Sequence, residues 1–229
     1  MSRTSQTIKA LSQSTIRLAP PTRVIERASI ADAGAWHEAC TQDPDAFWEA
    51  AAHDLHWFKP WDSVSRIDGS EHAWFIGGHT NLSYNCLERN IARGLGAKTA
   101  LFYESENGDS SSFTYEEILA HTSRIANALS SLGVSRGDRI VVYMPLGPEG
   151  VFTMHACVRI GAIHSVVYAG MGAEALRQRI EDSGAKVVVC SDVTYRRGKA
   201  VPLKPIVEEV VNKFIDQAFP PAVRAGGKS

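Results

Sequence analysis

The chain has 229 residues, which is enough for one large domain or two small ones with a hydrophobic core. Its composition, 44% hydrophobic and 21% charged, is that of an ordinary globular protein. The formal net charge of −1 argues against nucleic acid or an anionic membrane as a partner bound through overall charge.

The cysteines and the apolar runs exclude two further classes of protein. Cys40, Cys86, Cys157 and Cys190 are scattered without a CxxC pair, so neither a zinc site nor a disulfide framework is predicted. No apolar run approaches the roughly 18 residues that a membrane-spanning helix needs. Because the cysteines show neither pattern, reduced thiols in an intracellular compartment are expected.

Residues 1–30 are predicted to form a flexible N-terminal arm. The segment contains Arg3, Lys9, Arg17 and Arg23 but no acidic residue before Glu26. This composition fits the arm of a cytoplasmic protein, and it also resembles a transit peptide to the mitochondrial matrix. The sequence leaves both interpretations open.

Residues 31–96 are predicted to be a helical extension rich in aromatic side chains. Asp43 followed by Pro44 predicts a capped helix over 44–55, within a segment 31–62 that is interpreted as helical throughout. A turn-rich connector follows, with one short strand at 74–76. Spaced apolar residues then predict a helix from Leu82 that ends at Gly94 or Gly96.

Residues 97–219 alternate between strands and helices. The runs of Val and Ile are nearly continuous, which favours a parallel sheet covered by helices on both faces and hence an α/β fold. Strands are predicted at 99–105, 113–115, 138–144, 163–170 and 186–192, and helices at 115–133, 149–162, 172–184 and 201–216. Residues 220–229 are expected to be a truncated tail, because they offer neither a closing strand nor a capped helix.

Two glycine patterns and one histidine pair resemble binding sites but match them poorly. The final "GGKS" fails as a phosphate-binding loop because Ala222 stands where that motif needs glycine. Gly170 and Gly172 match a dinucleotide fingerprint only weakly, since such a motif usually follows the first strand of its unit. His53 and His56 have helical spacing but no third ligand, so a metal site is not predicted.

A basic cluster follows the apolar run at 185–190. It consists of Arg196, Arg197, Gly198 and Lys199. One interpretation is a solvated turn, because exposed Arg and Lys are common. The other is a site for an anion at the end of a buried strand, since glycine permits close approach and the cations offer charged donors.

Several stretches together resemble the AMP-forming short-chain acyl-CoA synthetases, the group that includes acetyl-CoA and propionyl-CoA synthetases. The resemblance runs from about Asp43 to Glu209 and is carried most specifically by "YNCLER", "GDRIVVYMP" and "RRGKAVPLK". The resemblance implies that the chain contains the first part of the large N-terminal domain of an adenylate-forming enzyme. Such an enzyme uses ATP with Mg²⁺ to adenylate a short-chain carboxylate, acetate or propionate, and then transfers the acyl group to coenzyme A.

The same resemblance locates only part of the active site in this chain. Tyr168, Ala169 and Gly170 correspond to residues that line the thioester path, although Ala169 replaces a glycine. The basic cluster corresponds to residues that meet the 3′-phosphate end of coenzyme A, with Lys199 in place of an arginine. The family's ATP site and adenylation lysine belong to later segments, so the chain alone is expected to be inactive, with no catalytic residue and no metal ligand of its own.

Two rival interpretations belong to other classes. One is a non-catalytic α/β binding or assembly module that retains the first half of the fold. The other is a nicotinamide-binding domain, which the continuous resemblance disfavours. The remainder of a synthetase chain is the expected macromolecular partner in the first interpretation, whether the chain is a fragment, a truncated gene product or the opening of a fusion.

Overall fold

A computed structural model describes residues 18–218, which divide into two compact units. The first unit comprises the described residues up to Asp54 together with Ser63–Trp74. The second comprises Leu55–Asp62 and the described residues from Phe75 onward. Residues 1–17 of the predicted arm and the predicted tail at 220–229 lie outside the described residues.

The first unit begins with short helices whose starts follow from their capping residues. Asp32 caps α3 (Ala33–Gln42) by accepting hydrogen bonds from the backbone N–H groups of Gly34 and Ala35. Asp43 caps α4 (Pro44–His53) through the N–H of Ala46. The helix predicted to begin at Pro44 is therefore confirmed, and a single turn, α2 (Thr22–Ile25), precedes both.

A β-hairpin follows where the sequence predicted mostly a connector. β1 (Ser63–Asp68) pairs with β2 (Glu71–Ile76), so the predicted strand at 74–76 is only the end of a longer one. Gly69 adopts a positive φ of 60°, as the tight turn after Asp68 requires. The prediction of a helical segment throughout 31–62 is wrong beyond His53, because no helix is present over residues 54–62.

The helix predicted from Leu82 is broken into three pieces. α5 (Leu82–Cys86) is capped by the side chain of Asn81, and α6 (Glu88–Asn90) and the π-helical turn η1 (Ile91–Leu95) follow. Gly94 interrupts the last piece with a φ of 83°. Glycine adopts this left-handed backbone readily, so the helix ends near the predicted residue.

The core of the second unit is a three-stranded parallel sheet in the order β6-β5-β7. β5 (Arg139–Met144) lies between β6 (Ile163–Tyr168) and β7 (Val187–Cys190). Residues 140–143 of β5 are 0–1% exposed, so this strand is buried on both faces. The predicted α/β fold with a helix-covered parallel sheet is confirmed.

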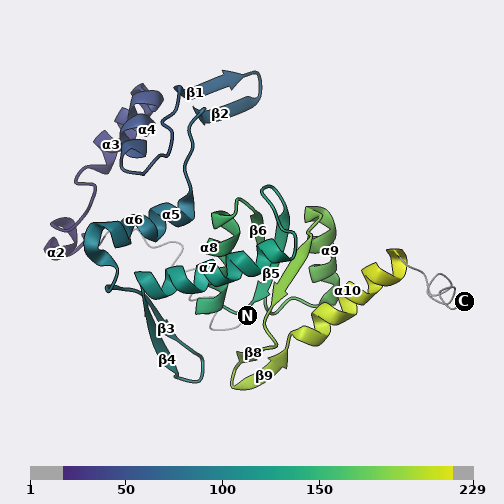
Figure 1. The fold of residues 1–229 in the computed structure, drawn as a ribbon. Coiled ribbons are helices and arrows are strands. Elements are labelled where there is room, and N and C mark those ends of the chain that lie inside the picture. Colours follow the sequence, from purple (N-terminus) through teal and green to yellow (C-terminus); the bar gives the residue numbers. More distant parts are fainter. Residues whose placement is uncertain (1–17, 219–229) are drawn as a thin grey trace, which may run out of the picture. The chain divides into compact units, whose positions relative to one another are not determined.

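Helices cover the two faces of this sheet (Figure 1). On one face, Ile140 and Val142 pack with residues of α7 (Tyr115–Ser131) and α8 (Pro148–Arg159). On the other, Val141 and Tyr143 pack with residues of α9 (Ala173–Ser183) and α10 (Lys204–Ala218). The alternation along β5 thus divides the core of the second unit into two layers.

Two antiparallel hairpins complete the second unit. β3 (Thr99–Glu104) pairs with β4 (Ser110–Thr114), and Thr114 with Glu117 forms a capping box that starts α7. β8 (Val193–Arg196) pairs with β9 (Lys199–Pro202). The sequence did not predict this second hairpin, and β9 occupies the start of the segment that was predicted to be helical from residue 201.

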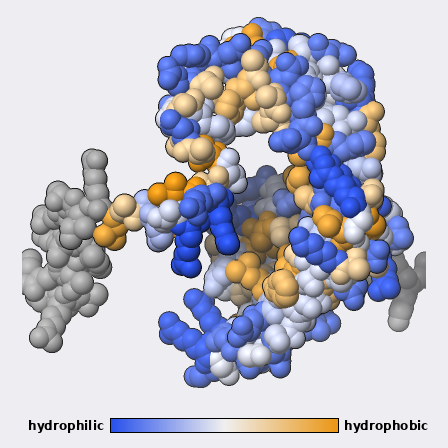
Figure 2. All heavy atoms as spheres, turned by 90° about the vertical axis from the view of Figure 1, so that its left-hand side faces the viewer, coloured by the Kyte–Doolittle hydropathy of each residue, from blue (hydrophilic) through white to orange (hydrophobic). Residues whose placement is uncertain are grey.

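Polar and apolar side chains alternate over the surface. Figure 2 shows hydrophobic patches among hydrophilic ones on the face that it presents. Within residues 18–218, no helix has both the length and the hydrophobicity to span a bilayer.

Candidate functional site

A cavity of about 630 Å³ in the second unit contains predicted site residues. It lies beyond the carboxyl ends of β5 and β6, where ligands commonly bind in α/β sheets. Four segments contribute most of its lining: the β3–β4 loop, the segment from the end of β5 into α8, the turn after β6, and the first strand of the β8–β9 hairpin.

The turn after β6 is held by a buried tyrosine. The backbone N–H groups of Gly170 and Met171 both donate to the carbonyl of Tyr168, at 2.8 and 3.0 Å. The hydroxyl of Tyr143 then donates to the carbonyl of Met171 at 2.5 Å. Burial raises the pKa of Tyr143, so this hydroxyl remains a donor at neutral pH.

The side chains of Tyr168 and Arg196 lie close together beside Gly170. The guanidinium carbon of Arg196 lies 5.9 Å from the centroid of the Tyr168 ring, within the range of a cation–π interaction. A Cβ atom on Gly170 would lie 2.8 Å from Cε1 of Tyr168 and 3.0 Å from Nη1 of Arg196. The absence of a side chain at position 170 therefore permits this close approach.

The β8–β9 hairpin presents the remaining basic residues. Arg196 faces Lys199 in the register, so Arg197 and Gly198 form a two-residue turn. Their φ angles of 53° and 72° are the positive values of a type I′ turn. The backbone N–H of Gly198 donates to a carboxylate oxygen of Glu106 at 3.0 Å, which joins the hairpin to the β3–β4 loop.

The structure brings four of the seven predicted site residues to one cavity. Tyr168, Ala169, Gly170 and Arg196 all line it. Arg197, Gly198 and Lys199 lie on the exposed turn and the first position of β9, and they are not among its lining residues. Ala169 is buried and packs with the core cluster of α9 and α10, so its methyl group contributes to the core as well as to the wall of the cavity.

Carboxylates are the main feature of this cavity that sequence reasoning missed. Glu104, Glu106, Asp109 and Glu149 line it together with a single cation, Arg196. The Asn107-Gly108 pair in this loop is a signal for a tight hairpin turn, but nothing in the local sequence indicates which distant segment the loop faces. The cavity is thus acidic toward the β3–β4 loop and basic at Arg196.

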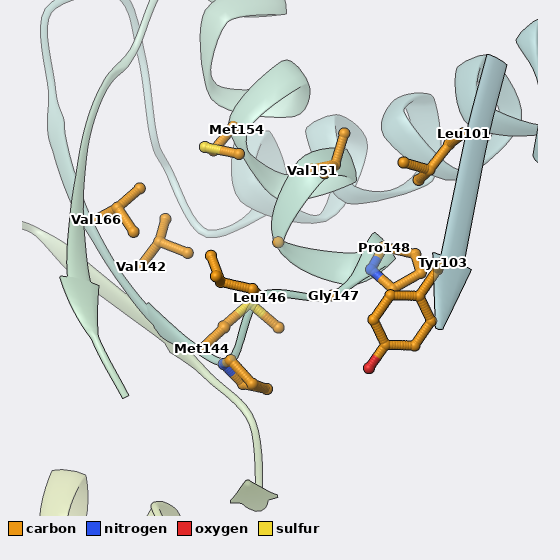
Figure 3. A pocket seen from close by; sticks show the side chains of 12 residues that line it. Leu101, Tyr103, Val142, Met144, Leu146, Gly147, Pro148, Val151, Met154 and Val166 are labelled. Atoms are coloured by element: carbon orange, nitrogen blue, oxygen red, sulfur yellow. The ribbon is translucent and has the colours of Figure 1, made fainter. Parts of the chain in front are cut away.

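A smaller, apolar cavity of about 200 Å³ adjoins the first (Figure 3). The two cavities share Tyr103, Met144, Pro145, Leu146 and Val166. Figure 3 shows Val142, Val151 and Met154 among the apolar side chains around it. The same edge of the sheet therefore offers a charged compartment next to an apolar one.

The described residues offer little for metal or thiol chemistry. Among them, no group of three or more His, Cys, Asp or Glu side chains is arranged to hold a metal ion. His56 instead packs against the rings of Phe58 and Tyr84, at 4.9 and 4.8 Å between centroids. Burial is the main cause of the raised pKa of Cys190, which ends β7, and a raised pKa disfavours a nucleophilic thiolate.

Comparison with known proteins identifies the family of this chain. The model of the AMP-binding enzymes matches residues 87–223, which is more than half of the chain. The chain belongs to the AMP-binding enzyme family. A second family model, that of the acetyl-coenzyme A synthetase N-terminus, matches residues 34–86, so the resemblance seen in the sequence is confirmed.

Curated relatives of this AMP-binding chain are much longer than it is. An acetyl-coenzyme A synthetase of Deinococcus radiodurans is 48% identical over 72% of the chain and 26% of its own length. That of Cupriavidus metallidurans is 43% identical over 84% of the chain and 30% of its own length. A 3-hydroxypropionyl-coenzyme A synthetase of Sulfurisphaera tokodaii is 46% identical over 77% and 27%. The chain spans between about a quarter and a third of the relatives that it matches.

Proposed function

We propose that this chain is the N-terminal segment of an ATP-dependent, AMP-forming acyl-CoA ligase. The ligase activates a short-chain carboxylate as an acyl-adenylate and then transfers the acyl group to coenzyme A. The proposal is supported by membership of the AMP-binding family and by relatives named as acetyl- and 3-hydroxypropionyl-coenzyme A synthetases. Acetate or propionate is the proposed carboxylate, and the cytoplasm is the proposed location.

The contribution that we assign to this segment is part of the coenzyme A site. The observation that carries it is that Arg196, Tyr168 and Gly170 line one cavity, although 26 residues separate Gly170 from Arg196 in the sequence. A guanidinium suits the phosphate groups of coenzyme A, and a glycine permits the close approach of its extended arm. The adjoining apolar cavity suits the less polar part of such a ligand.

The adenylation half-reaction is assigned to other parts of the proposed ligase. ATP, its Mg²⁺ and the carboxylate would bind there, because the family resemblance assigns the ATP site and the adenylation lysine to later segments. The side chains described above would act later, by holding coenzyme A while its thiol attacks the acyl-adenylate. Charged donors such as Arg196 and Lys199 would hold the phosphate end.

The test compares the two half-reactions in the natural full-length protein. Arg196→Ala should raise the coenzyme A KM about 10-fold, the lower end of the range for a charged hydrogen bond, because Arg196 is exposed. Acetate-dependent pyrophosphate exchange should not change, since it precedes entry of the thiol. Equal losses in both half-reactions would argue for a structural role, and a wild-type protein without coenzyme A-dependent product would overturn the proposed function.

A further inference from the structure

The turn of the β8–β9 hairpin forms a hydrogen bond with a residue that is distant in the sequence and lies outside the basic cluster. The N–H of Gly198 donates to Oε1 of Glu106 at 3.0 Å, although 92 residues separate the two in the sequence. Glu106 lies in the β3–β4 loop and lines the same cavity as Arg196. A carboxylate that lines the cavity thus holds the turn that follows Arg196, although the turn itself does not line the cavity.

The hairpin has few means of its own to stay in place. Each of its strands is four residues long, and the two strands form a separate two-stranded sheet in the described part of the chain. Two-stranded hairpins are marginally stable on their own. Arg197 also adopts a positive φ of 53°, a conformation that costs a non-glycine residue free energy. A tether at the turn therefore restricts where the hairpin lies.

We propose that Glu106 is a positioning residue for coenzyme A. It acts through the backbone of Gly198 and so fixes Arg196 and Lys199, which flank the turn, relative to Tyr168. This inference rests on the proposed coenzyme A site and adds a residue that the basic cluster did not include.

Glu106 has two effects on an anionic ligand, and they have opposite signs. Its hydrogen bond to Gly198 holds the cations in place, which favours binding of a phosphate. Its negative charge, one of four carboxylates in the lining, repels the same phosphate. Glutamine separates the two effects, because it keeps an oxygen acceptor at the same position and removes the charge.

The experiment measures coenzyme A kinetics in the natural full-length protein with Glu106→Ala and Glu106→Gln. Glu106→Ala should raise the coenzyme A KM by about 3- to 10-fold, the consequence of losing one hydrogen bond with a charged acceptor at an exposed site. Glu106→Gln should give a KM at or below that of the wild type. Acetate-dependent pyrophosphate exchange should stay the same in both variants, because it does not use coenzyme A.

Glu209→Ala serves as a control for the loss of one negative charge. Glu209 lies on α10, is exposed, and pairs with Lys213 on the same helix. Its removal changes the net charge as Glu106→Ala does but does not touch the hairpin. The coenzyme A KM of this control should match that of the wild type.

Hydrogen exchange at the amide of Gly198 provides a measurement that does not depend on the ligand. Exchange should be faster in Glu106→Ala and close to wild type in Glu106→Gln, because only alanine removes the acceptor. If both variants lower the KM, or if exchange and KM do not change in Glu106→Ala, the positioning role is overturned. Equal loss of both half-reactions also overturns it. A wild type that forms no coenzyme A-dependent product refutes the proposed function instead, and the exchange measurement alone then tests the hydrogen bond between Gly198 and Glu106.

Discussion

The guanidinium carbon of Arg196 lies 5.9 Å from the ring centroid of Tyr168, and no side chain at Gly170 comes between them. Arg196 belongs to the β8–β9 hairpin and Tyr168 to the end of β6. The contact therefore joins a small peripheral hairpin to the central sheet. It orients the one cation in the lining of the acidic cavity.

The first prediction concerns the ring of Tyr168. Tyr168→Leu should raise the coenzyme A KM by about 2- to 5-fold, since an exposed cation–π contact is worth about 0.5–1 kcal/mol. Tyr168→Phe keeps the ring and should behave as the wild type. Steady-state kinetics with varied coenzyme A would check both, and equal KM values for the two variants would contradict a role for the ring.

The second prediction concerns the space at Gly170. Gly170→Ala places a Cβ atom 2.8 Å from the Tyr168 ring and 3.0 Å from the Arg196 guanidinium, so these side chains must move. Both are side-chain atoms and can shift, so the melting temperature should change by no more than about 2 °C while the coenzyme A KM rises by about 5-fold. Thermal melting and kinetics should be measured together.

Gly172→Ala is the matched control for this substitution. A Cβ atom at Gly172 would meet no atom within 4 Å, and its φ of −75° suits alanine. The variant should bind coenzyme A as the wild type does. A comparable rise in KM in both variants would show that the flexibility of the turn matters more than the space at Gly170.

The third prediction concerns the hydroxyl of Tyr143. Tyr143→Phe leaves the carbonyl of Met171 without its buried donor, which should lower the free energy of unfolding by about 1–2 kcal/mol. Tyr195→Phe, at a half-exposed position on β8, should have little effect. Urea unfolding of the natural full-length protein would measure both, and similar stabilities for the two variants would contradict the assigned hydrogen bond.

The fourth prediction concerns pH and two partly buried histidines, His155 on α8 and His164 on β6. Burial lowers the pKa of both, and the charge of His164 lowers that of His155 further, while Glu88 opposes the shift. Well above pH 6.5 both are mostly neutral in the folded and unfolded states. As the pH falls below about 6.5, the unfolded state binds protons first, so folding stability decreases until the folded-state pKa values are passed.

Urea unfolding between pH 5.5 and 7.5 would measure this decrease. The double variant His155→Gln, His164→Gln should depend less steeply on pH than the wild type in this window. Carboxylates titrate in both proteins, so the difference between the two slopes isolates the histidines. Identical slopes would show that neither histidine is held neutral by the fold.

The central sheet could be predicted because its signal is local. The run of apolar residues in β5 is buried on both faces, and such continuous runs are typical of parallel strands. Asp43-Pro44 and Gly184 mark helix ends through their own backbone chemistry, and the structure has α4 starting and α9 ending at these residues. Each of these features depends on residues close together in the sequence.

Two of the three hairpins, β1–β2 and β8–β9, were harder to predict. Gly69 after Asp68 is a turn signal that the sequence contained, yet the polar strands beside it lack a clear alternation. The turn of β8–β9 has Arg197 where a type I′ turn usually has Asn, Asp or Gly, so the residues of this turn do not indicate a hairpin. A cluster of basic residues does not by itself predict a β-hairpin.

The candidate site could be predicted only in part, for a different reason. Tyr168 ends β6 of the central sheet, whereas Arg196 ends β8 of a separate hairpin, so no pairing between strands brings the two residues together. Glu106 reaches Gly198 from a loop 92 residues away, and its direction depends on how the β3–β4 hairpin packs. Contacts of this kind arise from tertiary packing and leave no local pattern.

The position of β5 at the centre of the sheet also has a consequence for synthesis on the ribosome. β5 is made before β6 and β7, its neighbours on both sides, and before α10, whose Val207 and Val210 complete one layer of the core. At about 5–20 residues per second, several seconds pass between the synthesis of β5 and that of α10. Both edges of this apolar strand are unpaired until β6 is made, and one layer of its core stays incomplete until α10 is made, so we expect β5 to be a segment that a chaperone protects in the nascent chain.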